Sequence, residues 1–327
     1  MIKENGKLRQ IELPANVKIF LPALGALLVV GVIASVMSEN FLTSRNILNV
    51  LNQAVTTGIM GVGITFILAC GKFDLSSAAT VCLTGMISSD LCANFGVHWA
   101  VAILVALLIG VCVGLFNGFL VAYLGLIPFI ATMGTMNMLK GMSLMYSKSL
   151  TIFGMPNAYT MWGSSRLFGF LPSGIVVSLI LYGIGFVLLS RSVFGHRIFS
   201  IGGNTEAAKL AGINVKRTIL WAYVLAGLCY AIAGVVLTGR VGAAYPSAAE
   251  GTELEVIAGI VIGGTAMSGG RGSHVGTWLG ILLVALINNA INLLGISAYA
   301  TKLVQGSVIL IAVIAEVLRS KAQEKRL

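Results

Sequence analysis

Residues 97–123, VHWAVAILVALLIGVCVGLFNGFLVAY, contain no Lys, Arg, Asp or Glu. A helix of about 20 mostly apolar residues is long enough to cross the hydrocarbon core of a bilayer, so this stretch predicts a membrane-spanning helix. The whole chain shares this character. Hydrophobic residues make up 57% of it and charged residues only 10%, against about 25% charged in an average soluble domain.

Further stretches repeat the pattern along the chain, and we expect about ten spans in an all-α polytopic membrane protein. The second, third and eighth stretches are short or rich in glycine, which predicts broken or re-entrant helices. The chain then forms a single transmembrane domain over residues 1–327, with no separate soluble domain. The ten stretches are 19–37, 54–70, 75–93, 97–123, 127–146, 172–190, 218–239, 254–268, 275–295 and 300–318.

Basic residues fix the expected orientation, because cytoplasmic loops of membrane proteins are enriched in Lys and Arg. With the N-terminus inside, 15 of the 21 Lys and Arg residues fall on the cytoplasmic side. Both termini are then cytoplasmic (N-in/C-in), with tails at 1–18 and 319–327 and a large loop at 191–217. The longer outer loops, 147–171 and 240–255, are connectors that also offer surfaces for an external partner.

The same charge distribution argues against nucleic acid as a partner. The net charge is +10, but the cations lie in short loops between apolar runs, as the positive-inside rule requires. The five cysteines form no CxxC pair and the three histidines are scattered, so no disulfide framework or metal site is expected. The chain has no P-loop, which indicates that it does not hydrolyse ATP itself.

The loop at 191–217, RSVFGHRIFSIGGNTEAAKLAGINVKR, carries five cations and one acid, Glu206. Asn204 or Thr205 is placed to cap a short helix over 203–212, and Glu206 then lies in its first turn, where an acid suits the helix dipole. Gly212 ends it. We expect two or three turns parallel to the membrane, which either dock a cytoplasmic partner or lie on the lipid interface. Small apolar residues form one face: Ala207, Ala208, Leu210 and Ala211.

EAAKLAG, residues 206–212, resembles the EAAxxxG motif in permease subunits of ATP-binding-cassette importers, with Glu206, Ala207, Ala208 and Gly212 matching. The surrounding segment FGHRIFSIGGNTEAAKLAGINVKR, residues 194–217 with Gly203 among them, looks like the sugar branch, the ribose-, xylose- and galactoside-type permeases. The resemblance implies that this helix docks on a separate ATPase subunit and transmits its closure to the spans.

Three other segments continue the resemblance. GGTAMSGGRGSHVGTWLG, 263–280, is similar to the family's GGxSxxGGxGxxxGTxxG pattern, except that Ala266 and Met267 precede Ser268. Such a density of glycine permits tight turns and close helix packing. A phosphate-binding loop is disfavoured, because no strand precedes it and no Lys-Ser/Thr pair follows. The glycines singled out here are Gly263, Gly264, Gly269, Gly270, Gly272 and Gly276.

CGKFDLSSAA, 70–79, resembles the family pattern GGIDLSVG through Gly71, Asp74, Leu75 and Ser76, with Lys72 in place of a glycine. An ionisable residue at the membrane edge is a functional candidate, and Lys72 is its expected partner. The alternative is that Asp74 caps the third span and holds the loop. A further match is 132–152, which resembles TLGTMxIxRGL with Lys140 in the basic position.

Amides within spans are costly unless they find partners. Asn117, Asn137, Asn288 and Asn289 are therefore expected either to hydrogen-bond neighbouring helices or to line a polar path for a sugar.

The resemblance implies a transport subunit in a bacterial cytoplasmic membrane, not an enzyme, that translocates a monosaccharide of the ribose type. It implies four kinds of partner: a cytoplasmic ATPase that binds ATP and Mg²⁺, a soluble sugar-binding protein, a second permease subunit and the lipid. This chain itself would hold no cofactor. A related permease for a nucleoside or a signalling furanose is the alternative. An ion-coupled transporter is disfavoured, because ionisable residues in mid-span are scarce.

Overall fold

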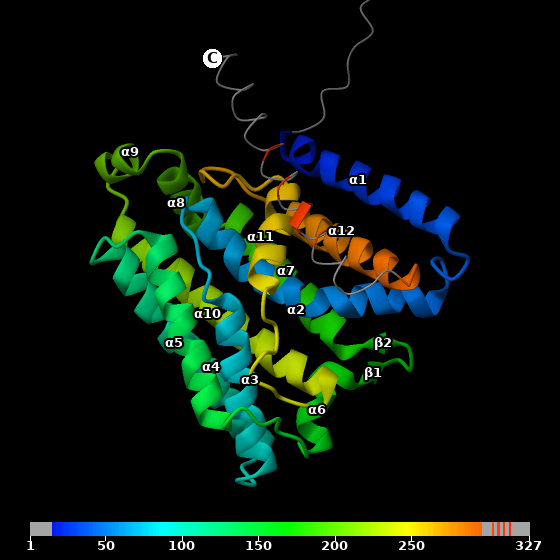
Figure 1. The fold of residues 1–327 in the computed structure, drawn as a ribbon. Helices are drawn as coiled ribbons and strands as arrows, with labels where there is room; N and C mark the ends of the chain where they lie inside the picture. Colours follow the sequence, from blue (N-terminus) through cyan, green and yellow to red (C-terminus); the bar gives the residue numbers. More distant parts are fainter. Residues whose placement is uncertain (1–14, 296–302, 304–305, 308–309, 311–313, 315–327) are drawn as a thin grey trace, which may run out of the picture.

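The computed structural model describes residues 15–295 and the helical positions 303, 306, 307, 310 and 314. Residues 15–295 form twelve helices and one small hairpin (Figure 1). The elements are α1 (Ala15–Met37), α2 (Ser44–Ala69), α3 (Ser77–Ala93), α4 (Trp99–Ala122), α5 (Pro128–Ser147), α6 (Asn157–Ser164), β1 (Arg166–Leu167), β2 (Leu171–Pro172), α7 (Ser173–Ser190), α8 (Val193–Gly203), α9 (Thr205–Leu210), α10 (Val215–Val241), α11 (Thr252–Ile262) and α12 (His274–Leu293).

Six of these helices are long and apolar enough to cross a membrane: α1, α2, α4, α7, α10 and α12. Together with the predominance of helix, this confirms a helical polytopic membrane protein. The eighth predicted span, 254–268, is shorter than the sequence suggested, because α11 ends at Ile262 before the paired glycines Gly263 and Gly264. Its 11 residues rise only about 17 Å. The tenth stretch, 300–318, lies almost entirely outside the described residues.

The second span begins ten residues earlier than its apolar pattern predicts, at Ser44 instead of 54. Polar residues in this first part, Asn46 among them, lower its hydropathy. Asn46 is nevertheless buried, because its amide and that of Asn289 on α12 exchange two hydrogen bonds of 3.0 Å. A partner 243 positions away therefore makes this polar turn compatible with a span.

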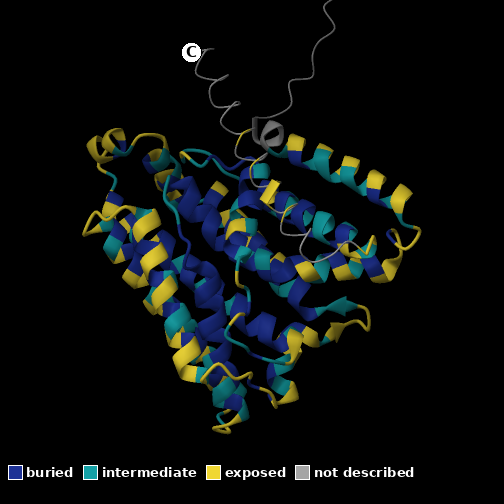
Figure 2. Ribbon diagram, in the orientation of Figure 1, coloured by how far each residue is buried: buried dark blue, intermediate teal, exposed yellow. Residues whose placement is uncertain are grey.

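Helices α2 and α10 form the centre of the bundle, where 78% and 72% of their spanning residues are buried, against 11% for α1 and 28% for α4. Figure 2 shows this arrangement, with buried residues inside and exposed ones along the rim. The rim is apolar: Leu28, Leu104, Ile130 and Ile184 are all more than half exposed. Such a surface suits contact with lipid rather than water.

The end of the bundle away from α9 carries both predicted outer loops. The loop 147–171 contains α6 and the start of the antiparallel β1–β2 hairpin. An isolated bridge between Ile152 and Ala244 joins it to the 240–255 loop, and Lys140 on α5 pairs with Glu250 at 2.9 Å. The two loops therefore form one connected surface.

Candidate coupling site and its junction with the spans

The exposed helix α9 is built by local capping. The side chain of Asn204 accepts hydrogen bonds from the backbone N–H groups of Glu206 and Ala207, each at 3.0 Å. Gly212 follows the helix with φ of +79°, a conformation that glycine adopts at little cost. The predicted cap and the predicted end are both present. The helix has only six residues, fewer than expected, because Gly203 belongs to the end of α8.

The surface of α9 is polar on one side and apolar at its end. Glu206 and Lys209 form an ion pair of 2.7 Å with side chains 78% and 54% exposed. Leu210 is 91% exposed, whereas Ala208 is buried. Ala207 and Ala211 are exposed too. An exposed leucine on a capped helix fits both expected roles of this loop, contact with a partner protein or with the lipid interface.

Three glycine-containing segments meet behind this loop, and we call this place the glycine junction. It comprises residues 69–71 at the end of α2, residues 202–203 at the end of α8, and residues 268–270 between α11 and α12. The N–H of Gly270 donates to the carbonyl oxygen of Ala69 at 3.0 Å. This bond joins the end of α2 to the α11–α12 loop, and the backbone of α8 at Gly202 lies directly against both.

Two residues show why the glycine junction needs glycine. A Cβ on Gly202 would collide with the carbonyl oxygen of Ala69 and the amide of Gly270, whereas one on Gly203 would meet nothing within 4 Å. Gly269 has a φ of +87°, and a Cβ there would lie 2.8 Å from both Gly202 Cα and Gly71 Cα. The backbones pack against each other directly, so a displacement of α8 has no side chain to absorb it.

The other predicted glycines of this loop hold α11 against α12. Gly263 and Gly276 face each other so closely that a Cβ on either would collide with the backbone of the other. Gly264 has a φ of +92° in the turn that ends α11, and Gly272 lies against Thr265. The predicted tight turns and close helix approach are therefore present, in a loop that joins two helices.

Asp74 is buried in the α2–α3 loop, and its partners differ from the expected one. Its Oδ1 accepts from the Ser76 N–H at 2.8 Å and from the Ser76 hydroxyl at 2.7 Å, and its Oδ2 accepts from the Tyr230 hydroxyl at 3.1 Å. The expected pairing with Lys72 is replaced by these neutral donors. Ser76, rather than Asp74, is the N-cap residue of α3. Asp74 therefore anchors the loop to the central helix α10.

The predicted amides have different environments. Asn117 is buried: it donates to the Ser76 hydroxyl at 2.8 Å and accepts from Thr135 on α5 at 2.7 Å. Asn289 is paired with Asn46, as described above. Both amides are used in helix–helix contacts, so neither lines an open path in this conformation. Asn137 is exposed on α5, and Asn288 borders a small cavity with Gln53, Thr57 and Glu255.

Sequence reasoning missed Tyr223 and Tyr230, which bring polar groups from α10 to the α2–α3 loop. Tyr223 donates to the carbonyl oxygen of Phe73 at 2.7 Å. Both lie in an apolar run, where a tyrosine hydroxyl gives little signal in hydropathy. The requirement that a buried hydroxyl find a partner is the signal that marks them.

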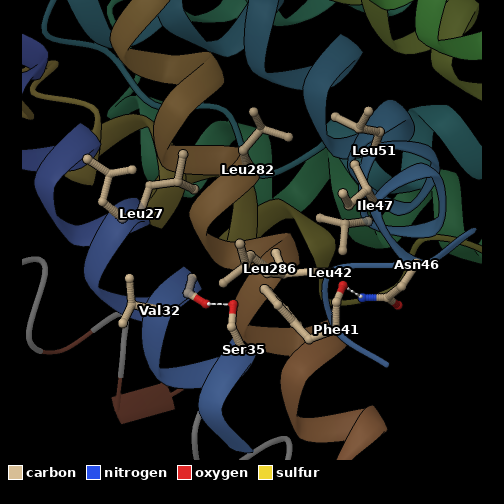
Figure 3. A pocket seen from close by; sticks show the side chains of 13 residues that line it. Leu27, Val32, Ser35, Phe41, Leu42, Asn46, Ile47, Leu51, Leu282 and Leu286 are labelled. Atoms are coloured by element: carbon tan, nitrogen blue, oxygen red, sulfur yellow. Dashed lines mark hydrogen bonds between the residues drawn. The ribbon is translucent and has the colours of Figure 1, made fainter. Parts of the chain in front are cut away.

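A larger cavity between α1, α2 and α12, about 460 Å³, is not a sugar site by its chemistry (Figure 3). Its walls are mostly Leu, Ile and Val. The polar side chains on it are Ser35 and Asn46, and each already bonds within the chain, to the carbonyl oxygens of Gly31 and Phe41. Hydroxyl-rich ligands require donors and acceptors that this wall does not offer.

A helical bundle with six candidate spans, polar and basic residues around one end, and a capped helix exposed there defines a polytopic membrane protein. Residues 46–313 match the family described as "Branched-chain amino acid transport system / permease component". The chain belongs to this family of inner-membrane transport permeases.

Curated relatives cover most of the chain. The ribose import permease protein RbsC of Bacillus subtilis is 40% identical over 295 residues, which is 90% of this chain and 91% of the relative. RbsC of Escherichia coli K12 is 35% identical, covering 89% and 91%. The D-allose transport system permease protein AlsC of the same strain is 34% identical, covering 90% of each. No solved structure matches significantly.

Proposed function

We propose that this chain is the membrane-spanning subunit of an ATP-driven importer that translocates a monosaccharide delivered by a soluble binding protein. The observation that carries the proposal is α9, a capped and exposed helix whose loop packs through the glycine junction onto a central span. The names of the relatives, ribose and D-allose permeases, support a sugar as the cargo.

In this proposal the basic end of the bundle faces the cytoplasm, with ten spans and both termini inside. Lys72, Arg197, Lys209 and Arg271 belong to loops at that end or to the α7–α10 connection. The opposite end carries the joined 147–171 and 240–255 loops, which would receive the binding protein. This arrangement follows the positive-inside rule.

The mechanism uses the glycine junction as a rigid link. Two ATPase subunits, which hold the ATP and Mg²⁺, close together and move α9 and α8. Because α8 contacts Ala69 and Gly270 backbone to backbone, the movement reaches α2 and the α11–α12 loop. The spans then shift between an inward-open and an outward-open arrangement, a population change driven by the ATPase.

The sugar path would lie between this chain and a second permease subunit. Asn137 is an exposed amide on the otherwise apolar outer face of α5, where the facing subunit would cover it. Asn288, Gln53, Thr57 and Glu255 come together from α12, α2 and α11 around a cavity of about 50 Å³. These side chains can hydrogen-bond sugar hydroxyls, but the cavity is smaller than a monosaccharide, so it would admit one only after the spans move apart.

The test is Glu206→Lys, which replaces the ion pair with Lys209 by a repulsion and removes the acid from the first turn of α9. We expect the protein to insert and fold normally, while its affinity for the co-expressed ATPase falls at least about fivefold, as for a contact of about 1 kcal/mol. Arg197→Gln, which removes the charge of one exposed side chain on α8, is the control. Unchanged ATPase binding and uptake by Glu206→Lys would contradict the coupling role.

A further inference from the structure

A third cavity, of about 610 Å³, lies at the basic end of the bundle between α1, α7, α8 and the loop that precedes α12. Two guanidinium groups line it, Arg191 at the C-terminal end of α7 and Arg271 in the loop. The hydroxyl-bearing residues Ser190 and Ser273 stand beside them. Among the described residues of its wall none is acidic. The part of the cavity beside Arg191 and Arg271 is therefore positively charged.

The rest of the wall is apolar and aromatic. Phe20 of α1, Phe186 of α7 and Phe199 of α8 line it together with Val275. A small soluble anion would gain no favourable contact from the three phenyl rings. A molecule that joins a negative headgroup to hydrocarbon satisfies both parts of the wall, because its charge meets the arginines and its glycerol and upper chains meet the rings.

The cavity continues onto a lipid-facing surface. Phe186 and Val187 are 38% and 55% exposed, and Ile184 and Ile180 continue the exposed side of α7 at 51% and 57%. Gly183 lies between them, and a Cβ there would meet nothing within 4 Å. This side of α7 is therefore an exposed apolar surface with a shallow gap at Gly183. It extends from the arginines toward the middle of the membrane.

We propose that this cavity binds one anionic phospholipid, with its phosphate between Arg191 and Arg271 and an acyl chain along α7. A cationic pocket between membrane helices is a recognised form of lipid site. The placement of this site in the cytoplasmic leaflet rests on the orientation proposed above. The binding site itself does not depend on that orientation. Because α8 supplies Phe199 and the 263–273 loop supplies Arg271, the lipid would join α8 to this loop beside the glycine junction.

The test is native mass spectrometry of the purified full chain, titrated with phosphatidylglycerol, phosphatidylcholine or inorganic phosphate. We expect retention of phosphatidylglycerol in preference to phosphatidylcholine. Arg191→Gln should weaken this binding about fivefold, the effect of one cation near a charged headgroup. Arg191 is exposed at a helix end, so the variant should fold. Arg197→Gln removes the same charge from the same loop outside the cavity, and it should bind as the parent does.

Three results would overturn the proposal. Equal loss in Arg191→Gln and Arg197→Gln would show general attraction by the basic loop rather than a site. If inorganic phosphate displaced phosphatidylglycerol at equal concentration, the ligand would be a soluble anion. Unchanged lipid binding with weakened ATPase association in Arg191→Gln would assign the cavity to the ATPase interface. Glu206→Lys, which changes α9 alone, should leave phosphatidylglycerol binding intact, so failure of the coupling proposal and failure of this one are distinguishable.

Discussion

Asp74 is a buried carboxylate whose three hydrogen bonds come from Ser76 and Tyr230. Asp74→Ala would remove these acceptors and leave the Tyr230 hydroxyl without a partner inside the bundle. A buried donor left unsatisfied costs about 1–3 kcal/mol. We therefore expect Asp74→Ala to lower the temperature at which half of the detergent-purified protein unfolds. Size-exclusion chromatography of heated samples measures the fraction that remains folded.

Tyr230→Phe isolates one of these hydrogen bonds, because it removes only the 3.1 Å bond to Asp74 and keeps both bonds from Ser76. Tyr230→Phe should therefore lower the thermal midpoint less than Asp74→Ala does. The double variant should lose less than the sum of the two single losses, since both remove the same contact. Strict additivity would show that the 3.1 Å bond contributes nothing to stability.

Sequence alone singled out Asp74 as a functional candidate, because an ionisable residue at a membrane edge is rare. It did not identify the partner correctly. Lys72 is close in sequence and opposite in charge, whereas Tyr230 lies 156 positions away in an apolar run. Local spacing favours the lysine; only the packing of α10 on the α2–α3 loop brings the tyrosine hydroxyl to the carboxylate.

At the scale of elements, the contact of α8 with α2 gives a prediction with a neighbouring control. Gly202→Ala places a methyl group against backbone atoms of Ala69 and Gly270, which must separate to receive it. Gly203→Ala is one residue away and meets open space. We expect Gly202→Ala to reduce transport-coupled ATP hydrolysis in proteoliposomes severalfold, while Gly203→Ala keeps the parent rate. Equal rates in both variants would contradict a rigid link.

The cap of α9 gives another prediction. Asn204→Ala removes the acceptor for two backbone N–H groups and should destabilise the short helix by about 1 kcal/mol. The measurable result is a severalfold weaker affinity for the ATPase subunit. Asn204→Asp keeps the acceptor and should restore the parent affinity. If Asn204→Asp is as weak as Asn204→Ala, the amide itself, rather than the cap, is what the partner requires.

The elements differ in how far sequence predicts them, and the reason is physical. The cap and end of α9 depend on Asn204 and Gly212, which act within a few residues, and both were predicted. The start of α2 was missed, because the polar residues of its first turns lower the hydropathy and the Asn46–Asn289 pair, which buries one of them, joins two helices far apart in sequence. The glycine motifs were each recognised, but their meeting at the glycine junction is a property of the packed bundle.

At the scale of the whole molecule, the unequal distribution of cations predicts which end faces the cytoplasm. Arg197 on α8 and Asn157 at the start of α6 are both exposed and lie in connections on opposite sides of the span α7. In intact cells, a charged, membrane-impermeant maleimide should label Asn157→Cys and spare Arg197→Cys until the membrane is permeabilised. The parent chain measures the background from its five native cysteines, of which Cys70, Cys82, Cys92 and Cys229 are buried. Labelling of Arg197→Cys in intact cells would reverse the orientation, and it would place α9 where no cytoplasmic ATPase can reach it.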